Sequence, residues 1–343
     1  MFHLFKENLV IINNEKCIRE KDKTYCENIE IKSISELLSK SFNVKLILRK
    51  AKVAPVHEIK NSEINISPNI FFFIKSLIVS IVKDKAKYLI ISVTPYTFLS
   101  FLLLLFFRKK IFLYLRSDGK KEISVIFGKI LSTVYKIVEN LMANFSTLIV
   151  VNDLISTKKN FHLVNPSQID NQWFENLKKI NRENIRLLYI GRIKTEKGVY
   201  SLIDIFKKLK SEEKKILLTI IGPGDKFEDK TEGIAFLDPI SSKKQLIDHY
   251  DQNHIFVLPS YTEGHPQVLI ESLSRKRPVI VFEEIKHVSK KYEGVFVCKR
   301  DHNHLLNLIK FIDKNYEEIL EKMKKNRYPT KENFFKQLNK ILN

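Results

Sequence analysis

Short apolar runs rich in β-branched residues alternate with longer helical patterns along the whole chain. Continuous runs of this kind are typical of parallel strands covered on both faces, because a strand with one solvated face would alternate apolar and polar residues. In the first half the runs lie at 9–13, 44–48, 88–93, 111–115 and 147–151. In the second half they lie at 185–191, 216–222, 234–237, 254–260 and 277–282. This alternation predicts two doubly wound, Rossmann-like α/β domains that face each other across a cleft.

The length of the chain supports two domains. At 343 residues and 44% hydrophobic composition, the chain is too long for one ordinary core and too apolar to be disordered. We place an N-terminal domain at 1–165, a polar linker at 166–184 and a C-terminal domain at 185–320. The last segment, 321–343, has a helical pattern and could pack back on the N-terminal domain.

Cysteine usage and the N-terminus indicate a cytoplasmic protein. The three cysteines, Cys17, Cys26 and Cys298, form neither an even framework nor a CxxC pair, which argues against a disulfide scaffold and a cysteine-bound zinc ion. The first apolar run is only about four residues long and precedes no small-residue cleavage site, so we expect no signal peptide.

The strong positive charge requires an anionic partner. The sequence holds 59 Lys and Arg against 39 Asp and Glu, a formal net charge of +20. A nucleic acid, an anionic membrane surface or a phosphorylated substrate would each fit this charge. No zinc finger, aromatic RNP-like strand or recognition-helix pattern accompanies it, so a nucleic-acid-binding protein is the weaker hypothesis and we expect no nucleic-acid partner.

One apolar segment, 88–107, has the length of a membrane span and precedes three basic residues at 108–110. However, Pro95 follows a good strand, polar residues interrupt the segment, and the next strand begins at 111 without room for a loop. We therefore predict a strand, a turn at Thr94–Pro95 and an apolar helix rather than a span.

Basic charge is concentrated around this segment. Between Lys75 and Lys136 the sequence holds twelve Lys or Arg against three acids. Apolar helices, expected at 70–82 and 97–107, interleaved with such charge are typical of a protein that rests on an anionic bilayer without crossing it. We expect peripheral association with the inner face of the plasma membrane. The alternative interpretation is two buried helices with ordinary solvated lysines.

The strand expected at 185–191 runs into the sequence GRIKTEKG. This turn places Gly191, Arg192 and Lys197 at the carboxyl end of a parallel strand, where open α/β sheets bind ligands. Gly191 permits close approach of the backbone, Arg192 can bind a phosphate through its fork of donors, and Lys197 adds a second cation. The pattern is consistent with a pyrophosphate site, although an ordinary solvated turn would show the same residues.

A second loop carries two carboxylates. A buried strand, a loop with Glu263, Gly264 and His265, and a helix that begins near Pro266 follow one another in the second half. Glu271 lies about 7 to 8 Å further along that helix, so the two glutamates could contact two ends of one extended ligand. A carboxylate accepts two hydroxyl donors well, which suits the diols of sugars and ribose. The alternative for Glu271 is an exposed helix acid, against which its apolar flanks argue.

Three segments together resemble the C-terminal domain of glycosyltransferase family 4. They are GRIKTEKG at 191–198, IIGPGD at 220–225 and PSYTEGHPQVLIESLSRKRPVI at 259–280. The family consists of retaining sugar transferases of the GT-B fold. The resemblance therefore implies transfer of a sugar from a nucleotide-diphosphate sugar without a required metal or other cofactor, and we expect the donor to be a UDP-sugar.

The resemblance also implies roles for individual residues. Glu263 would contact the sugar, Glu271 the ribose, and Arg192 with Lys197 the diphosphate, where two cations stabilise the departing group. The catalytic candidates are therefore Arg192, Lys197 and Glu263. Gly222 to Asp225 would line the nucleotide side, and the further donor-binding candidates are Gly191, Gly222, Gly224, Gly264, His265, Pro266 and Glu271.

The chain departs from the family pattern at three places. The segment 13–25 contains no glycine, where family members usually carry a glycine-rich loop after the first strand. The strand at 111–115 runs into Arg116 and Asp118 where a histidine is common, so both are acceptor-site candidates, with an ordinary turn as the alternative. Lys276 follows the donor-binding helix where the family has a glycine, at a position that often requires a positive φ.

These patterns predict a cytoplasmic, peripherally membrane-bound glycosyltransferase. Its acceptor would be a glycan or a lipid-linked sugar, in the synthesis of bacterial capsule, lipopolysaccharide or a related surface polysaccharide. A sugar-nucleotide epimerase with the GT-B fold is an alternative, but it would need acid and base residues of its own in the cleft. The sequence holds no motif for such residues.

Overall fold

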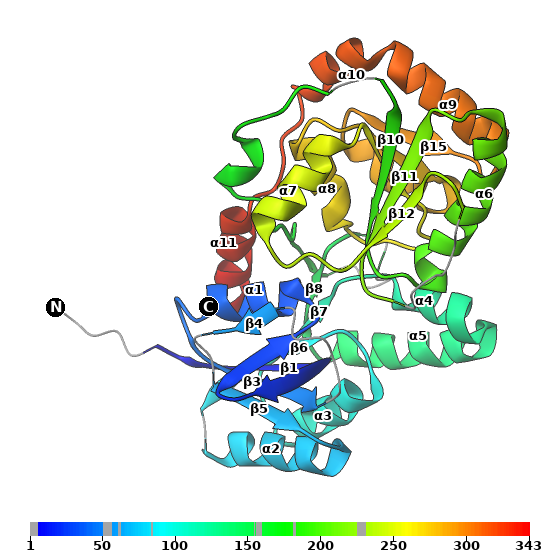
Figure 1. The fold of residues 1–343 in the computed structure, drawn as a ribbon. Helices are drawn as coiled ribbons and strands as arrows, with labels where there is room; N and C mark the ends of the chain where they lie inside the picture. The colour runs from blue at the N-terminus through cyan, green and yellow to red at the C-terminus, as the bar shows by residue number, and fades with distance from the viewer. Residues whose placement is uncertain are drawn as a thin grey trace. The chain divides into compact units, whose positions relative to one another are not determined.

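The computed structural model of the protein describes residues 6–50, 57–60, 63–83, 85–153, 155, 160–180, 183–224 and 231–343. The chain divides into two compact units, each with its own sheet and hydrophobic core (Figure 1). Unit 1 comprises Met1–Gln168 and Lys331–Asn343, and unit 2 comprises Ile169–Thr330.

Unit 1 is built on a mostly parallel sheet. Its described strands are β1 (Asn8–Glu20), β2 (Lys23–Cys26), β3 (Asn43–Lys50), β4 (His57–Ile59), β5 (Glu63–Ser67), β6 (Ala86–Ile91), β7 (Ile111–Leu115), β8 (Thr147–Val150) and β9 (His162–Leu163). Its described helices are α1 (Ile29–Leu38), α2 (Ile70–Lys83), α3 (Pro95–Phe106), α4 (Gly119–Phe127), α5 (Lys129–Asn144) and α11 (Lys331–Leu342). The parallel strands follow the order β5-β3-β1-β6-β7-β8-β9. Strands β3 and β5 thus lie on one side of the central pair β1 and β6, and strands β7, β8 and β9 lie on the other.

The direction of each connection decides which face its helix covers. α2, α3 and α5 lead from β5, β6 and β7 to the next strand in the same direction across the sheet, and right-handed crossovers therefore place them on one face. α1 leads from the β1–β2 region to β3 in the opposite direction and lies on the other face, where α11 packs beside it (Figure 1). The last helix, α11, adds Phe334, Leu338 and Leu342 to the core of unit 1.

β1 is longer than the strand predicted at 9–13, because the chain continues into an antiparallel hairpin. The far end of β1 pairs with β2, with Cys17 opposite Cys26, and the turn at Lys21 has a φ of 52°. Both thiols are buried, and burial raises the pKa of Cys26 to about 12. The glycine-free segment 13–25 is therefore mostly strand and hairpin rather than an irregular loop.

The apolar segment 88–107 forms a strand and a helix, as predicted. Thr94 caps α3: its hydroxyl accepts the N–H of Thr97 at 3.2 Å, while the Thr97 hydroxyl accepts the N–H of Thr94 at 2.8 Å. Pro95 fits at the first helical position, because a backbone N–H at that position would have no acceptor within the helix and proline therefore loses no hydrogen bond. Within the described part of the chain, every helix falls short of the length and apolar character needed to cross a membrane.

Unit 2 is built on a parallel sheet with the order β12-β11-β10-β13-β14-β15. Its described strands are β10 (Ile185–Ile190), β11 (Ile216–Ile221), β12 (Ile234–Leu237), β13 (Ile255–Leu258), β14 (Val279–Phe282) and β15 (Val295–Cys298). Its described α-helices are α6 (Val199–Glu212), α7 (Lys243–Gln252), α8 (Gln267–Ser274), α9 (His302–Lys314) and α10 (Tyr316–Met323). Short 3-10 turns lie at Asn171–Phe174, Thr195–Lys197 and Glu283–Lys291. The prediction of two doubly wound α/β domains is confirmed.

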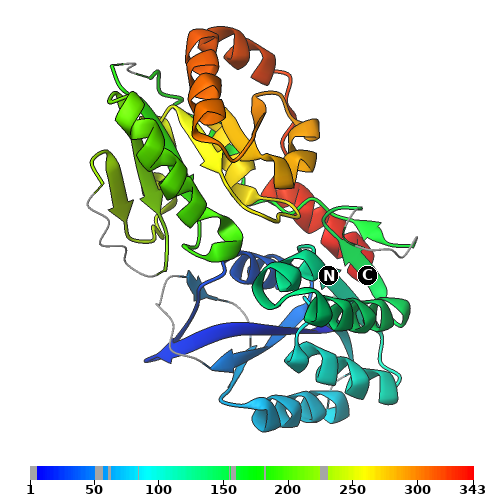
Figure 2. The same cartoon turned by 90° about the vertical axis from the view of Figure 1, so that its right-hand side faces the viewer.

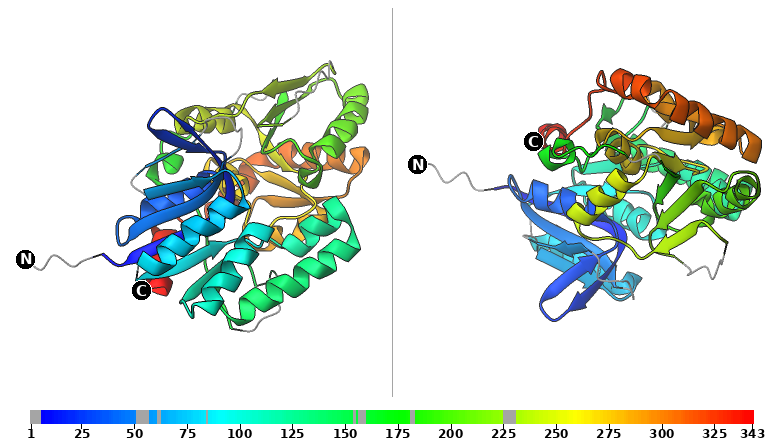
Figure 3. Two further views of the ribbon diagram at one scale, coloured as in Figure 1. Left: turned by 90° about the horizontal axis from the view of Figure 1, so that it is seen from below. Right: turned by 45° about the horizontal axis from the view of Figure 1, so that its top comes forward.

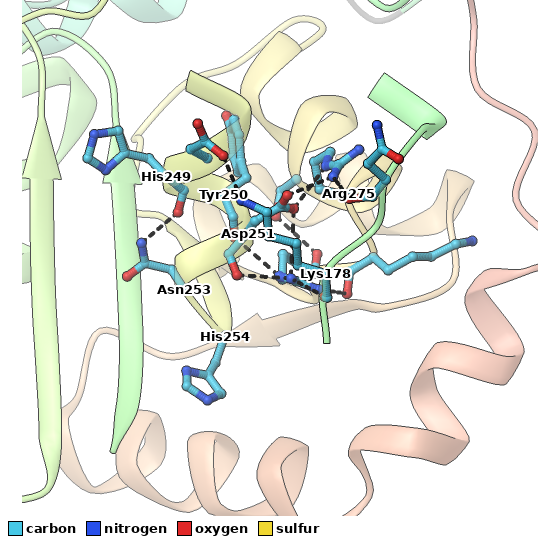
Figure 4. Close-up of polar contacts among 12 residues, drawn as sticks. Lys178, His249, Tyr250, Asp251, Asn253, His254 and Arg275 are labelled. Carbon is cyan, nitrogen blue, oxygen red and sulfur yellow. Dashed lines mark hydrogen bonds and ion pairs between the residues drawn. The ribbon is translucent and has the colours of Figure 1, made fainter. Parts of the chain in front are cut away.

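A buried arginine fastens much of the expected linker, 166–184, to unit 2 (Figure 4). Arg275 donates through Nε and Nη2 to the two carboxylate oxygens of Asp251, at 2.9 and 2.7 Å, and both side chains are about 1% exposed. Its Nη1 donates to the carbonyl oxygens of Trp173 at 3.0 Å and Glu175 at 2.6 Å. The Trp173 ring is buried in the core of unit 2, so the segment around Trp173 is part of that unit and not a free linker.

Replacement of Arg275 with methionine should strongly destabilise unit 2. The buried Asp251 carboxylate would keep only Arg277, at 3.8 Å, and breaking a buried ion pair from one side costs about 3 to 5 kcal/mol. Urea unfolding followed by fluorescence measures this, because the single tryptophan of the sequence, Trp173, lies in the network. Lys178→Met, which breaks an exposed ion pair, is the control and should leave the midpoint nearly unchanged. Equal urea midpoints for Arg275→Met and Lys178→Met would show that the Arg275–Asp251 pair does not stabilise unit 2.

α8 ends in a Schellman arrangement with a lysine where glycine is favoured. The N–H of Lys276 donates to the carbonyl oxygen of Leu273 at 3.0 Å, and that of Arg277 donates to Ser272 at 3.0 Å. Lys276 has a φ of 57°, a left-handed conformation that costs a side chain roughly 1 to 2 kcal/mol relative to glycine. The expectation of a positive φ at this position is confirmed.

Lys276→Gly should therefore stabilise unit 2 by about 1 kcal/mol, because glycine adopts this conformation without the steric cost. The urea midpoint is again the measurement. Lys208→Gly, in the middle of α6, is the matched control and should lower stability by about 1 kcal/mol, as glycine does in a helix interior. A fall in the midpoint for Lys276→Gly would show that the lysine is not strained.

Candidate functional site

The order of the sheet in unit 2 places its binding region. β10 and β13 are neighbours although the chain visits β11 and β12 between them, so the loops after these two strands turn to opposite sides of the sheet. β10 and β13 pair only at Leu187↔Ile255 and Leu188↔Phe256, whereas β10 and β11 remain paired as far as Ile190↔Ile221. The carboxyl ends of β10 and β13 thus part from each other, and the two motif loops follow these ends.

Lys197 and Glu263 meet at this point. The Lys197 ammonium donates to Oε1 of Glu263 at 2.8 Å, with the two side chains 21% and 13% exposed. The Ser260 hydroxyl donates to the same carboxylate oxygen at 2.7 Å, and a ring nitrogen of His287 lies 3.0 Å from the Glu263 carbonyl oxygen. The structure therefore brings two of the predicted catalytic candidates into direct contact and adds Ser260, which sequence analysis missed.

Arg192 lies in the same loop but is more exposed. Its guanidinium is 3.8 Å from the Glu196 carboxylate, and 52% of its side chain is accessible. The buried Tyr189 hydroxyl donates to the Arg192 carbonyl oxygen at 2.8 Å, which fixes the backbone of the turn and leaves the cation in solvent. Arg192 is thus an exposed positive charge in the loop after β10 that also carries Lys197.

Two glycines let the loops of this region approach closely. A Cβ added at Gly198, where φ is 66°, would lie 2.0 Å from the Pro259 carbonyl oxygen and so would separate the loops after β10 and β13. A Cβ added at Gly222 would lie 1.9 Å from the Gly191 carbonyl oxygen. Gly224 is bridged to the same loop, because the Ile193 N–H donates to the Pro223 carbonyl oxygen beside it at 2.8 Å. Asp225 lies outside the described residues.

Arg300 is a second contributor that sequence analysis missed. Its Nη2 donates to the Pro259 carbonyl oxygen at 2.5 Å and its Nε donates to Glu284 at 2.6 Å. The guanidinium carbon lies 4.0 Å from the ring centroid of Tyr261 and 4.6 Å from that of Phe282. Arg300 therefore holds the loop after β13 from the side of β15, and a lone arginine after a strand gives no sequence signal for this role.

Glu271 is buried in the middle of α8, five residues after Pro266 and the loop that carries Gly264 and His265. Its side chain is 7% exposed, and the Tyr250 hydroxyl donates to Oε2 at 2.8 Å. Burial raises the pKa of Glu271 to about 7, and the Tyr250 hydrogen bond opposes that rise. The alternative of an exposed helix acid is wrong. Tyr250, which precedes Asp251 of the buried network, lies on α7 and was not anticipated (Figure 4).

The acceptor candidates lie in unit 1 and differ in their contacts. Arg116, at the carboxyl end of β7, pairs with Glu30 at 3.3 Å, and the Tyr114 hydroxyl donates to the other Glu30 oxygen at 2.8 Å. Burial raises the pKa of the neighbouring Glu15, and the charge of Arg116 opposes that rise. Asp118 instead caps α4, where its carboxylate accepts the N–H of residue 121 at 3.2 Å. Arg116 thus belongs to a polar cluster, whereas Asp118 has the ordinary cap role.

Across the described residues, the His, Cys, Asp and Glu side chains form no group of three or more that could hold a metal ion. Two cationic side chains, Arg192 and Lys197, lie in the loop at the carboxyl end of β10.

Comparison with known proteins identifies the second unit. Residues 171–330 match the family model described as glycosyl transferases group 1. The chain is similar to the putative teichuronic acid biosynthesis glycosyltransferase TuaC of Bacillus subtilis, with 32% identity over 35% of this chain and 28% of that protein. It is also similar to the capsular polysaccharide biosynthesis glycosyltransferase CapM of Staphylococcus aureus, with 30% identity over 33% of this chain and 32% of that one. The matched part thus spans less than a third of either relative.

A solved structure extends the likeness to the fold of the whole chain. The crystal structure of Anabaena Alr3699/HepE in complex with UDP and glucose superposes with a TM-score of 0.68, at 11% identity, over 97% of this chain and 98% of that one. The fold predicted from the sequence is therefore confirmed. The chain has the two-domain GT-B fold of glycosyltransferases, and its second unit carries a domain that matches glycosyl transferases group 1.

Proposed function

We propose that the protein is a retaining glycosyltransferase of family 4 that transfers a sugar from a nucleotide-diphosphate sugar to a glycan or lipid-linked acceptor. The observation that carries the proposal is the Lys197–Glu263 pair at the parted ends of β10 and β13, beside Arg192 and near the helix of Glu271. The printed functions of the two relatives favour bacterial surface polysaccharide as the product, and the UDP and glucose in the Anabaena structure favour a UDP-sugar as the donor.

In this proposal the nucleotide binds through its ribose. The carboxylate of Glu271 accepts the ribose hydroxyls, while Tyr250 holds its Oε2 in place. Gly191, Gly222 and Gly224 keep the neighbouring backbone close and free of side chains, on the nucleotide side. Gly264, His265 and Pro266 line the pocket for sugar and phosphate at the start of α8.

The diphosphate is stabilised by two cations instead of a metal ion. Without donor, Lys197 is neutralised by Glu263, which avoids an unpaired charge in a half-buried place. When the donor binds, Lys197 and the exposed Arg192 turn to the phosphates, and Glu263 accepts hydroxyls of the sugar. Charge grows on the diphosphate as the glycosidic bond to the donor breaks, and preorganised cations stabilise that charge.

Arg116 and Asp118 remain the acceptor candidates of this proposal, with Arg116 the stronger because Asp118 is engaged as a helix cap. The family match and the two relatives are glycosyltransferases, so neither the epimerase nor a nucleic-acid-binding protein is favoured.

Glu271→Gln should weaken UDP binding and remove part of its pH dependence. Loss of a charged acceptor costs about 1.5 to 3 kcal/mol. Because the pKa of Glu271 is raised to about 7, wild-type affinity should fall as the pH drops from 8 to 5.5 and the carboxylate is protonated. Calorimetric titration with UDP measures both effects, and because the terminal phosphate titrates in the same range, only the difference between variant and wild type counts. Parallel pH profiles would contradict the ribose assignment.

The same substitution should stabilise the unliganded protein at high pH. A folded-state pKa above the unfolded value means that burial of the ionised carboxylate opposes folding, so wild-type stability falls between pH 4.5 and 7 and stays low above that range. Glu271→Gln should remove this fall. Because its fold is then preserved, weaker UDP binding cannot be attributed to unfolding.

Arg192→Gln together with Lys197→Gln should nearly abolish sugar transfer, because removal of one preorganised charge donor costs roughly 100- to 1000-fold in rate. Release of UDP from UDP-sugars in the presence of membrane extract is the measurement. Lys194→Gln is the matched control, since it removes an exposed charge from the same loop and should change the rate less than about twofold. Transfer by the double variant at a near wild-type rate would overturn the proposed diphosphate role of Arg192 and Lys197. If none of UDP, GDP, dTDP and ADP bound the wild-type protein, the proposed function itself would be overturned.

A further inference from the structure

Unit 1 exposes large apolar side chains along one stretch of the chain. Of the 25 large hydrophobic side chains that are exposed among the described residues, 19 lie between Phe71 and Phe145. They lie on or directly after α2, α3, α4 and α5. α2, α3 and α5 are neighbours on one face of the sheet (Figures 2 and 3). We call the exposed side of these four helices the apolar face of unit 1. Soluble monomers rarely expose a contiguous apolar patch beyond about 600 Å², and larger patches mark interaction sites.

α5 turns an apolar stripe away from the core of unit 1. Its exposed apolar residues recur at i, i+4, i+7 and i+11, namely Ile130, Val134, Ile137 and Leu141. Ile130 is 83% exposed and Ile137 is 65% exposed. The inner side buries Met142 and Ala143 in the core, but it also buries the polar residues Ser132 and Glu139, whose carboxylate pairs with Lys136 at 2.6 Å. A helix that served only the core would carry polar residues on its outer side, so the exposed apolar stripe of α5 favours an apolar environment outside unit 1.

The corner between α4 and α5 is strongly exposed. Gly128 joins the helices with a φ of 86°, and a Cβ added there would meet no atom within 4 Å. Phe127 and Ile130, on either side of it, are 60% and 83% exposed. α4 itself buries only Gly119, which packs against the Tyr135 ring of α5. Sequence analysis expected membrane contact from 70–82 and 97–107 and did not identify this corner.

α2 repeats the arrangement at the other end of the face. Phe71, Ile78 and Val82 are exposed on one side of the helix, at 81%, 39% and 75%, and Lys75 lies on the same stripe. Phe73 and Leu77 are fully buried on the other side. The helix therefore anchors in the core through one side and leaves a second apolar side without a protein partner in unit 1.

Among the described residues from 71 to 145, the exposed charged side chains are all basic, and because they lie on or next to the four helices we call them the cationic border of the apolar face. Its exposed basic residues are Lys75, Lys83, Lys85, Arg108, Lys110, Lys120, Lys121 and Lys129. Among the described residues between 71 and 145, none of the acids is exposed: Asp118 and Glu122 are half-buried and Glu139 is buried. An apolar centre with a cationic border is complementary to a surface of acyl chains and anionic headgroups.

We propose that the apolar face of unit 1 docks on an anionic lipid bilayer, with the α4–α5 corner inserted among the acyl chains. A second copy of the chain fits less well, because a twofold interface pairs each patch with itself and would bring the cationic borders together. The bilayer supplies the opposite charge and needs no matching shape. This docking does not depend on the transferase reaction and is tested by binding alone.

Sedimentation with lipid vesicles tests the proposal. The full chain should bind vesicles of phosphatidylcholine mixed with phosphatidylglycerol more tightly than vesicles of phosphatidylcholine alone, and salt should weaken the binding. Phe127→Ser with Ile130→Ser and Ile137→Ser should reduce binding by roughly tenfold or more, because three exposed anchors are lost while the core is untouched. Arg108→Gln with Lys110→Gln should reduce it by roughly tenfold at low salt.

Two control variants remove the same chemistry elsewhere. Leu177→Ser with Leu237→Ser removes exposed apolar residues from unit 2, and Lys314→Gln with Lys325→Gln removes exposed charges from it. Both should bind like wild type. Wild-type protein that stays in solution with anionic vesicles would overturn the proposal, as would equal losses in test and control variants. Light scattering that showed a wild-type dimer, converted to a monomer by the triple serine variant, would assign the face to a second copy and overturn it as well.

Discussion

The parting of β10 and β13 beyond Leu188 is the constraint on which the rest of the candidate site depends. It follows from the order of the sheet, since two neighbouring parallel strands whose following loops turn to opposite sides leave space at their carboxyl ends. Lys197 lies in the loop after β10 and Glu263 in the loop after β13, and the two side chains meet beyond these strand ends. Gly198 keeps the two loops in contact, because a side chain there would collide with Pro259. The Lys197–Glu263 pair is thus a consequence of topology and of one glycine.

The second glutamate is positioned by a network that also fastens the start of unit 2. Arg275, after α8, holds Asp251 of α7, and the preceding residue, Tyr250, donates to Glu271 of α8 (Figure 4). Helices α7 and α8 therefore have two roles. Through Arg275 they bind the backbone of the segment around Trp173, and through Tyr250 they orient Glu271, the proposed ribose acceptor. Glu271 is thus held by a buried hydrogen bond, whereas half of the Arg192 side chain is exposed to solvent.

Sequence patterns were sufficient where the signal is local. Continuous apolar runs identified ten of the described strands but missed β2, β4, β5, β9 and β15, which are short. Thr94 and Pro95 located the start of α3, and the departure at Lys276 correctly indicated a positive φ. Patterns were insufficient where the contact is distant in sequence, as for Tyr250 with Glu271 or Arg300 with the loop after β13. The orientation of α5 is a third kind of case: its periodicity shows an apolar stripe but not which way the stripe faces. The rule that apolar residues turn inward would have given the wrong answer there.

A crystal structure of the protein grown with UDP tests the central claim most directly. The account predicts that the ribose hydroxyls bind Glu271, that the diphosphate lies against Arg192 and Lys197, and that the 2.8 Å contact between Lys197 and Glu263 opens to admit it. UDP bound at another place in the chain, or a diphosphate at this edge with the Lys197–Glu263 contact intact and Glu271 untouched, would contradict the account.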